Sequence, residues 1–293
     1  MKRILTLLLV FTLSMSLFAL DIFKYVPFSG DVKSYTQTDF TITSKFGDLF
    51  RTPNMKIIHN FDANGNEIEV AELSAKEVLL NKTLSKYDSA NNLLEQSCYD
   101  ASDELLWKTI ITYKDGKKID SSEYGKDGVL RGKVIYGYSG NNLAEETGYD
   151  SEGALVWKTI YKYTDNKLTT VSQYALDGSL DSEDVIAYAA DGKTESITST
   201  DCFTGVTVQK IFRYAANGNL SEITTYDAAK QIINRLMIKY DNTGNLSRLS
   251  EYKISVKFGS TQNELISMSE YAYSDSVTTY EVAEPKAKVI DAK

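Results

Sequence analysis

Regularly spaced aromatic residues are the part of this sequence best suited to bind a ligand. Trp107 and Trp157 stand 50 residues apart, and Tyr136 and Tyr161 each stand two residues before another tyrosine. On one face of a β-sheet, such rings would form a row able to stack on sugars or to receive an extended partner chain. The same rings could instead be core, buried where a wide sheet curls on itself. Trp107, Tyr136, Trp157 and Tyr161 are therefore the candidate ligand-binding residues.

Residues that could carry out catalysis are few. The single histidine, His59, has no partner histidine and no nearby cysteine, so it cannot form a typical zinc site. The motifs GxSxG and HExxH are absent, as is a phosphate-binding glycine loop. Paired carboxylates could hydrolyse glycosides, but most of the 40 acidic residues lie in turns or recur once per repeat. We predict no catalytic residues and no enzymatic activity, with a glycoside hydrolase as a distant alternative.

One turn has the start of a calcium-binding pattern. In the segment FDANGNE, Asp62, Asn64 and Asn66 occupy alternating positions, as the first ligands of a calcium loop do. The glycine at the sixth position and the acidic residue at the twelfth are missing, so we interpret the segment as an ordinary turn. The sequence predicts no metal site and no cofactor.

An internal repeat sets the positions of the candidate residues. The segment NNLLEQSCYDASDELLWKTI begins at Asn91, and 50 residues later the chain reads NNLAEETGYDSEGALVWKTI. Each copy divides in half, which gives a unit of about 25 residues, and this regularity is typical of repeat proteins. An aromatic residue recurs at steps of 25 or 26 residues, at Phe61, Tyr87, Tyr113, Tyr138, Tyr163, Tyr188, Tyr214 and Tyr240.

Turn signals and alternation predict the fold class. Clusters such as DANG, KDGK, DSEG and DNTG recur at half-period intervals and can close tight hairpins. Trp107, Thr109 and Ile111 would share a mostly apolar face, opposite a half-solvated face that carries Lys108 and Ile110. We predict an all-β antiparallel meander of about eight tandem hairpins, forming an elongated or curled sheet.

The register of the hairpins also places the repeated carboxylates. If Tyr99 pairs with Leu105 across the intervening turn, Glu95 faces Thr109. The equivalent residues Asp120, Glu145 and Glu222 would then lie, like Glu95, on the aromatic face.

The chain divides into five segments. Residues 1–20 have the basic start, apolar run and small-residue end of a secretory signal peptide. Residues 21–54 are predicted to be an N-terminal cap over the first strand edge, and residues 55–252 to be the tandem hairpins. Residues 253–280 would form a modified final repeat and C-terminal cap, followed by a loose tail at 281–293. We expect an exported protein, located in the periplasm, at the cell surface or outside the cell.

Charge and cysteine spacing restrict the partners further. Loss of Lys2 and Arg3 with the signal peptide would change the net charge from −8 to −10, which disfavours nucleic acid and anionic lipid as partners. No later apolar stretch is long enough for membrane insertion after cleavage. Cys98 and Cys202 lie too far apart for a disulfide in an extended meander, whereas a sheet that curls back could bring them together.

The repeat units resemble a known family. The segments FRYAANGNL, KYDNTGNL, YDSEGAL and YKYTDNKL are similar to the YD repeats of bacterial RHS-type proteins, over roughly residues 55–252. They also resemble MORN-like hairpin repeats of YwqK-type antitoxin proteins. Tyr124 and Tyr174 depart from the pattern because Gly and Ala follow them. RHS proteins use such sheets as a shell around cargo, for which this chain is short, so the resemblance implies β-hairpin repeats at a bacterial surface or in its secretions.

These observations together predict a non-catalytic binding or scaffold module for another macromolecule. A protein is the favoured partner. A polysaccharide, bound by the aromatic rows, is the alternative.

Overall fold

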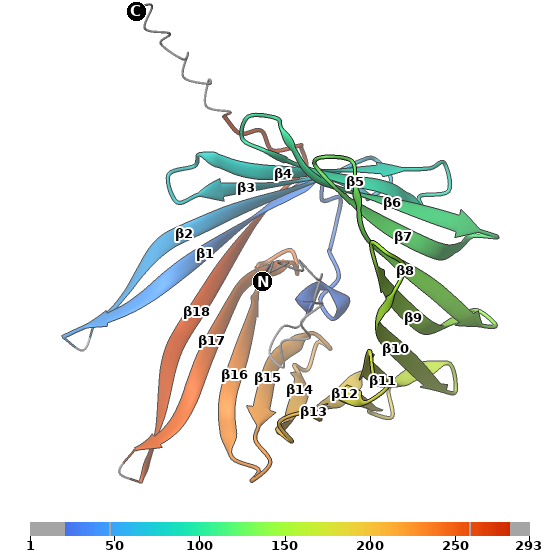
Figure 1. Cartoon of the computed structure of the whole chain (residues 1–293). Coiled ribbons are helices and arrows are strands. Elements are labelled where there is room, and N and C mark those ends of the chain that lie inside the picture. Colours follow the sequence, from blue (N-terminus) through green and yellow to red (C-terminus); the bar gives the residue numbers. More distant parts are fainter. Residues whose placement is uncertain (1–20, 47, 258, 282–293) are drawn as a thin grey trace, which may run out of the picture.

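The computed structural model describes residues 21–46, 48–257 and 259–281 (Figure 1). Eighteen antiparallel strands follow one another in a single sheet, and the first strand also pairs with the last. The prediction of an all-β antiparallel meander is confirmed. The prediction of an elongated or curled sheet is wrong, because the sheet closes into a barrel. The predicted signal peptide at 1–20 and residues 282–293 of the predicted tail lie outside the described residues.

The strands have these bounds: β1 Ser34–Lys45, β2 Asp48–Phe61, β3 Glu67–Ser74, β4 Leu79–Tyr87, β5 Leu93–Asp100, β6 Leu105–Lys114, β7 Lys117–Gly125, β8 Leu130–Ser139, β9 Asn142–Asp150, β10 Leu155–Thr164, β11 Lys167–Ala175, β12 Leu180–Tyr188, β13 Thr194–Asp201, β14 Thr207–Tyr214, β15 Leu220–Tyr226, β16 Ile232–Tyr240, β17 Leu246–Lys257 and β18 Ser260–Ser274. One short 3₁₀ helix, η1 (Ile22–Lys24), precedes them. Among the described residues, no helix is both long and apolar enough to span a bilayer.

Closure depends on the segment that the sequence predicted to be a cap. Residues 34–45 form β1, which pairs with β2 on one side and with β18 on the other. Ser34 lies opposite Ser274, and Thr41 lies opposite Ser267. The sheet is therefore closed along Ser34–Thr41 of β1, whereas the last residues of β1 and the first residues of β18 extend beyond this ladder.

The turns form for the reasons that the sequence indicates. At the turn after β4, one Asp88 carboxylate oxygen accepts hydrogen bonds from the backbone amides of Ala90 and Asn92, at 2.8 and 2.9 Å. Asn91 adopts a φ of 63° there, and Gly65 has a φ of 82° in the equivalent turn after β2. Asparagine and glycine tolerate this left-handed region better than other residues, which explains their recurrence between strands.

The recurrent tyrosines tie neighbouring strands together. The Tyr87 hydroxyl donates to the Glu67 carbonyl oxygen, 20 residues earlier, at 2.9 Å. Tyr188, Tyr214 and Tyr240 repeat this bond to carbonyl oxygens 20 residues earlier, at 2.8 to 3.0 Å. A hydrogen bond that must be made at the same place in each unit is a physical reason for the spacing of 25 or 26 residues.

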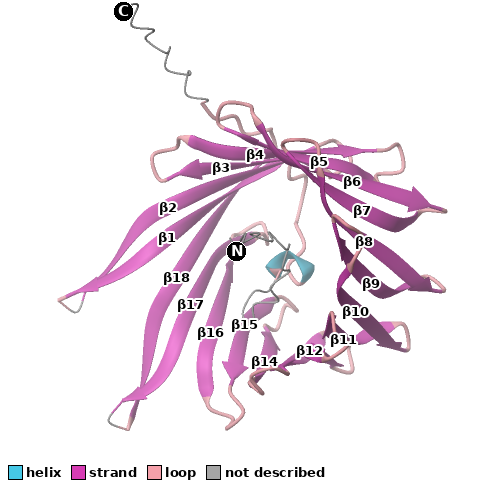
Figure 2. Ribbon diagram, viewed as in Figure 1, coloured by secondary structure: helices cyan, strands magenta, loops and turns pink. Residues whose placement is uncertain are grey.

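The N-terminal segment lies inside the barrel (Figure 2). Ile22 and Val26 are 6% and 3% exposed, and they pack against a cluster on β13–β17 that includes Phe212 and Ile238. Phe23 and Phe28 contact the ring of Tyr35 on β1, with centroids 5.3 and 5.5 Å apart. The faces that carry these residues therefore line the lumen.

The C-terminal segment that follows β18 packs on the opposite, outer face. The Asn60 amide donates to the Thr278 carbonyl oxygen at 3.1 Å, and its oxygen accepts from the Thr278 backbone amide at 3.0 Å. Tyr280 donates to Glu69 and covers an apolar cluster that contains Ile58 and Leu73. These contacts fix residues 276–280 to the outer wall of β2 and β3.

β-Bulges correct the predicted position of the repeated carboxylates. Tyr99 pairs with Leu105 as predicted, but Trp107 pairs with Cys98, which leaves one extra residue in β6. Glu95 consequently pairs with Ile110, not with Thr109, and lies on the outer face. There Glu95 forms ion pairs with lysines at 2.9 and 3.1 Å. Asp120, Glu145 and Glu222 form equivalent ion pairs, so they do not lie on the aromatic face.

Both cysteines are free thiols, so closure of the barrel does not join them. Cys98 is buried on β5, and burial raises the pKa of its thiol. Cys202 is exposed in the turn after β13.

Candidate ligand-binding wall of the lumen

The four candidate residues all lie on the luminal face of β6, β8 and β10. Residues two apart in a strand share a face, and residues opposite each other in a ladder share it too. Tyr161 pairs with Val171, and Val171 pairs with Asp184, which stands two residues before Ile186 of the luminal cluster. The same steps lead from Tyr161 to Trp157, Tyr136 and Trp107 through the ladders of β6–β10. We call Trp107, Tyr136, Trp157, Tyr161 and the strands β6–β10 that carry them the aromatic wall.

Trp157 rests on the backbone of Gly148, the residue opposite it on β9. A Cβ at position 148 would lie 2.3 Å from Cε2 and 2.4 Å from Nε1 of the indole. Glycine therefore creates the space that the ring occupies. In the preceding repeat copy, Cys98 stands opposite Trp107, so the two indoles are seated differently. The replacement of Cys98 by Gly148 between two otherwise similar copies is a sequence signal for this difference.

Two charged residues join the tyrosines of the aromatic wall. Lys118 on β7 places its ammonium nitrogen 4.3 Å from the centroid of the Tyr136 ring, a cation–π contact. Burial lowers the pKa of Lys118, while the Glu146 carboxylate on β9 acts in the opposite direction. Burial raises the pKa of Tyr136 to about 12, and burial followed by the Glu146 charge raises the pKa of Tyr161. Around Tyr136 and Tyr161 the site is thus a half-buried arrangement of rings with Lys118 and Glu146 beside them.

Sequence reasoning missed Lys118 and Glu146. They lie on β7 and β9, where a single charged residue in a strand carries no clear signal. Glu146 lies directly opposite Tyr136, but this register depends on a bulge between Gly137 and Tyr138, which the sequence does not indicate.

The tyrosine end of the aromatic wall is hollowed. A depression of about 400 Å³ lies over β9 and β10 and next to their turns, lined by Tyr161 and Tyr163 together with Asn142 and Asp165. Of the four candidate residues, only Tyr161 lines it. Trp107 and Trp157 stand four or more residues away along their strands, nearer the opposite end of the barrel.

The N-terminal segment occupies a different part of the lumen. Its contacts run to β12–β18 and to β1 and β2, as in the pair formed by Tyr25 and Phe212 with centroids 4.9 Å apart. The N-terminal segment therefore covers one wall of the lumen. Within the described residues, it makes no contact with the aromatic wall.

The other candidate chemistries have structural partners. The Nδ1 atom of His59 lies 2.6 Å from a Glu67 carboxylate oxygen, and its ring stacks on Tyr35 with centroids 4.2 Å apart. One Asp62 oxygen accepts from the backbone amides of Asn64 and Asn66, which is the geometry of a turn. Across residues 21–46, 48–257 and 259–281, no group of three or more His, Cys, Asp or Glu is placed to hold a metal ion.

No family model and no curated protein matches the sequence. Among solved structures, the chain is similar to a porin-like protein from Bacteroides uniformis, with a TM-score of 0.47, 11% identity, and 84% of this chain and 99% of that chain covered. A TcdB2-TccC3-Cdc42 structure gives a TM-score of 0.28 and 13% identity, over 73% of this chain and 16% of that one. A protein of unknown function from Bacteroides fragilis gives 0.21 and 16%, over 51% and 96%. None of them is similar enough for its function to be transferred.

Proposed function

We propose that this chain is an exported, non-catalytic binding protein whose ligand enters the barrel and lies on the aromatic wall. A segment of another protein is the favoured ligand. The observation that supports this proposal most is the N-terminal segment, a stretch of polypeptide already bound inside the lumen.

That segment illustrates how the lumen holds a peptide. It buries Ile22 and Val26 almost completely against the wall of β13–β17 and adds ring contacts from Phe23 and Tyr25. The aromatic wall offers the rings of Tyr136 and Tyr161 and, in addition, the charges of Lys118 and Glu146, which can hydrogen-bond the peptide groups of an incoming chain. The closed ladder between β1 and β18 favours this mode over addition of a strand to a sheet edge.

The outer wall supports a barrel surrounded by water. Its repeated carboxylates pair with lysines and arginines across the strands, as Glu145 does with Lys158 at 2.7 Å. Between these ion pairs stand single aliphatic residues such as Ile110 and Ile135, which are 40% and 37% exposed. On this face, ion pairs flank each single aliphatic residue, and such a mixed surface is typical of a sheet face in contact with water.

Site-specific cross-linking in cells tests the proposed ligand. A photoreactive residue in place of Tyr161 is expected to capture a protein partner, whereas the same residue in place of Ile135, on the outer face of β8, is expected not to. Mass spectrometry of the cross-linked species then identifies the bound segment. Capture only from position 135, or equal capture from both positions, would contradict binding at the aromatic wall.

A polysaccharide is the second candidate, and the seating of Trp157 favours it. One side of the indole rests on Gly148, so the backbone of β9 holds the ring in place. A ring held in this way can serve as a platform on which a sugar stacks. A glycan array with the purified protein tests this reading. Binding is expected to weaken in Trp107→Ala and Trp157→Ala and to persist in Ile110→Ala, an outer-face control on β6. Silence on the array would leave protein as the ligand class.

A further inference from the structure

Two long hairpins, β1–β2 and β17–β18, protrude from one end of the barrel (Figure 1). β1 and β2 have 12 and 14 residues, and β17 and β18 have 12 and 15. β2 pairs with β3 only from Met55 onwards, and β17 pairs with β16 only up to Lys253. The ladder between β1 and β18 ends at Thr41 and Ser267. Beyond these residues the two hairpins extend past their neighbours and separate from each other.

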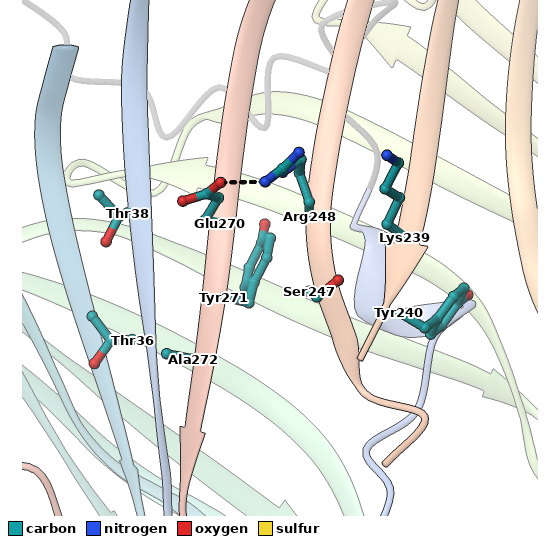
Figure 3. A pocket seen from close by; sticks show the side chains of 9 residues that line it. All are labelled: Thr36, Thr38, Lys239, Tyr240, Ser247, Arg248, Glu270, Tyr271 and Ala272. Atoms are coloured by element: carbon teal, nitrogen blue, oxygen red, sulfur yellow. Dashed lines mark hydrogen bonds and ion pairs between the residues drawn. The ribbon is translucent and has the colours of Figure 1, made fainter. Parts of the chain in front are cut away.

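A shared carboxylate links the two hairpins below their tips. Oε1 of Glu270 on β18 accepts hydrogen bonds from Arg51 on β2 and from Arg248 on β17, at 2.6 and 2.7 Å. Figure 3 shows the bond from Arg248, in a shallow hollow that β1, β16, β17 and β18 line. Burial alone would raise the pKa of Glu270, but the two arginines hold it below its ordinary value, so the carboxylate stays charged at neutral pH. The hairpins are thus presented as a pair.

The tips of the two hairpins are apolar and open to solvent. Phe46 is fully exposed, and Leu49, Phe50 and Val256 are 59%, 51% and 68% exposed. Phe46 also has a φ of 55°, which is unfavourable for a bulky side chain, and it is the one apolar residue among the described non-glycine residues with positive φ. Neither packing nor turn chemistry explains a phenylalanine at this position, which indicates a role for the exposed ring itself.

Both turns carry the same three residues. The chain reads Lys-Phe-Gly at 45–47 and again at 257–259. A lysine beside an aromatic residue suits the surface of a bilayer, because the ring can enter among the lipid headgroups while the ammonium group stays at the phosphates. Behind the first tip, Thr43 and Ser44 are exposed and polar, so only the tip itself is suited to enter.

Other turns at the same end of the barrel also expose apolar side chains. In an antiparallel meander, the turns after odd-numbered strands lie at one end and those after even-numbered strands at the other. Four further turns at the end of the long hairpins carry Val78, Val129, Leu176 and Phe203, which are 45% to 91% exposed. Within the described residues, the turns between strands at the other end carry no exposed large apolar side chain. The apolar tips are therefore a property of one end.

We propose that this end of the barrel docks on the surface of a lipid bilayer with zwitterionic headgroups, with the tips of the two long hairpins inserted among them. A bilayer accepts apolar tips at any spacing, whereas a protein partner would need a pocket matched to each tip. Zwitterionic lipids are favoured because the net charge of −8 opposes an anionic surface. The inference does not rest on the proposed function, since no residue of the aromatic wall takes part.

Sedimentation of the purified protein with phosphatidylcholine vesicles tests the docking. The protein is expected to bind them, and to bind phosphatidylglycerol vesicles more weakly. Phe46→Asn is expected to weaken binding about ten-fold or more, since burial of the ring drives insertion. Asparagine tolerates a left-handed φ better than phenylalanine does, so this variant should unfold in urea no more easily than the wild type.

Leu94→Asn is the matched control. Leu94 is 38% exposed at the start of β5, next to a turn at the other end of the barrel. Its substitution is expected to leave the affinity for vesicles unchanged. Both variants retain residues 1–20, so a difference between them cannot arise from the apolar run in that segment.

A fluorescent label locates the inserted end. Cys98 is buried, so Cys202→Ser combined with Asp48→Cys leaves one exposed thiol, next to the first tip. An environment-sensitive fluorophore on this thiol should shift its emission to shorter wavelength when phosphatidylcholine vesicles are added. The same fluorophore in Cys202→Ser combined with Ala216→Cys, in the turn after β14 at the other end, should not shift.

Several results would overturn the proposal. They are the absence of binding to phosphatidylcholine, equal affinities of Phe46→Asn and the wild type, equal weakening by Leu94→Asn, or an equal shift of both labels. Stronger binding to phosphatidylglycerol that salt abolishes would show an electrostatic contact instead. An oligomer that Phe46→Asn dissociates in the absence of vesicles would show that a second copy of this chain covers the tips.

Discussion

Substitution of Gly148 by alanine tests the seating of Trp157 directly. The new Cβ would lie 2.3 Å from the indole Cε2 atom, so the ring must leave its place on β9. Overpacking of this kind costs about 1–3 kcal/mol. Alanine also makes the unfolded chain less flexible than glycine does, which stabilises the folded protein by about 0.4–1 kcal/mol. We therefore expect Gly148→Ala to lower the free energy of unfolding by about 1–2 kcal/mol.

The assay is urea unfolding followed by tryptophan emission. Trp107 and Trp157 are the only two tryptophans, so a Trp107→Phe background makes Trp157 the sole reporter. Displacement of the ring towards the lumen should shift its emission in Gly148→Ala to longer wavelength. Gly137→Ala is the matched control, since a Cβ there meets Glu145 without a clash, its Cβ at 3.4 Å and its carbonyl oxygen at 3.8 Å, and Gly137 needs no positive φ.

A double-mutant cycle separates the clash from backbone effects. For this cycle Trp107 is retained as the reporter of unfolding. In a Trp157→Ala background, where no ring opposes position 148, the cost of Gly148→Ala should disappear, because the two residues act through their contact. If Gly148→Ala destabilises the protein equally in both backgrounds, or leaves the emission of Trp157 unchanged, the indole does not rest on Gly148 and the description of the aromatic wall is wrong.

Three further outcomes follow from single contacts. Tyr240→Phe removes the 2.8 Å hydrogen bond to a backbone carbonyl and should lower the free energy of unfolding in urea by about 0.5–1.5 kcal/mol. Tyr252→Phe removes no hydrogen bond within the described residues and should not lower it. Asn60→Ala removes both bonds to Thr278, so hydrogen exchange at residues 276–280 should become faster; unchanged protection would show that the segment is held by other contacts. Burial raises the pKa of Tyr136 from 10.0 to about 12, so its neutral form stabilises the fold below about pH 10, and this contribution is lost as the pH rises to about 12. Over that pH range the Tyr136→Phe variant should therefore lose less stability in urea unfolding than the wild type. An equal loss would contradict the burial of this phenol.

The sequence predicted the hairpins because their signals are local. Asp88 and Asn91 form their turn with residues within a few positions, and the tyrosine spacing reports a bond made once per unit. Closure could not be predicted in this way. The pairing of Ser34 with Ser274 joins residues 240 positions apart, in segments where the repeat pattern is absent.

The faces of the strands were predicted only in part. Alternation placed Trp107, Trp157, Tyr136 and Tyr161 on one face, which is the luminal face in the structure. It failed for Glu95, because a bulge next to Leu105 adds one residue and moves the carboxylate to the other side of the sheet. A single extra residue in a ladder leaves no mark in composition or period. The same slip explains why the charged partners of the tyrosines were not identified beforehand.

The pairing of β1 with β18 also sets the order of events during synthesis. Each of the other ladders joins strands that are neighbours in the chain, so those ladders can form while the polypeptide is still emerging. The first strand must wait for the last one, and until then its free edge is a template on which other chains could add. The barrel can therefore close only after β18 has been made, and a chain that stops short of residue 260 would leave the edge of β1 exposed along Ser34–Thr41, where β18 otherwise covers it.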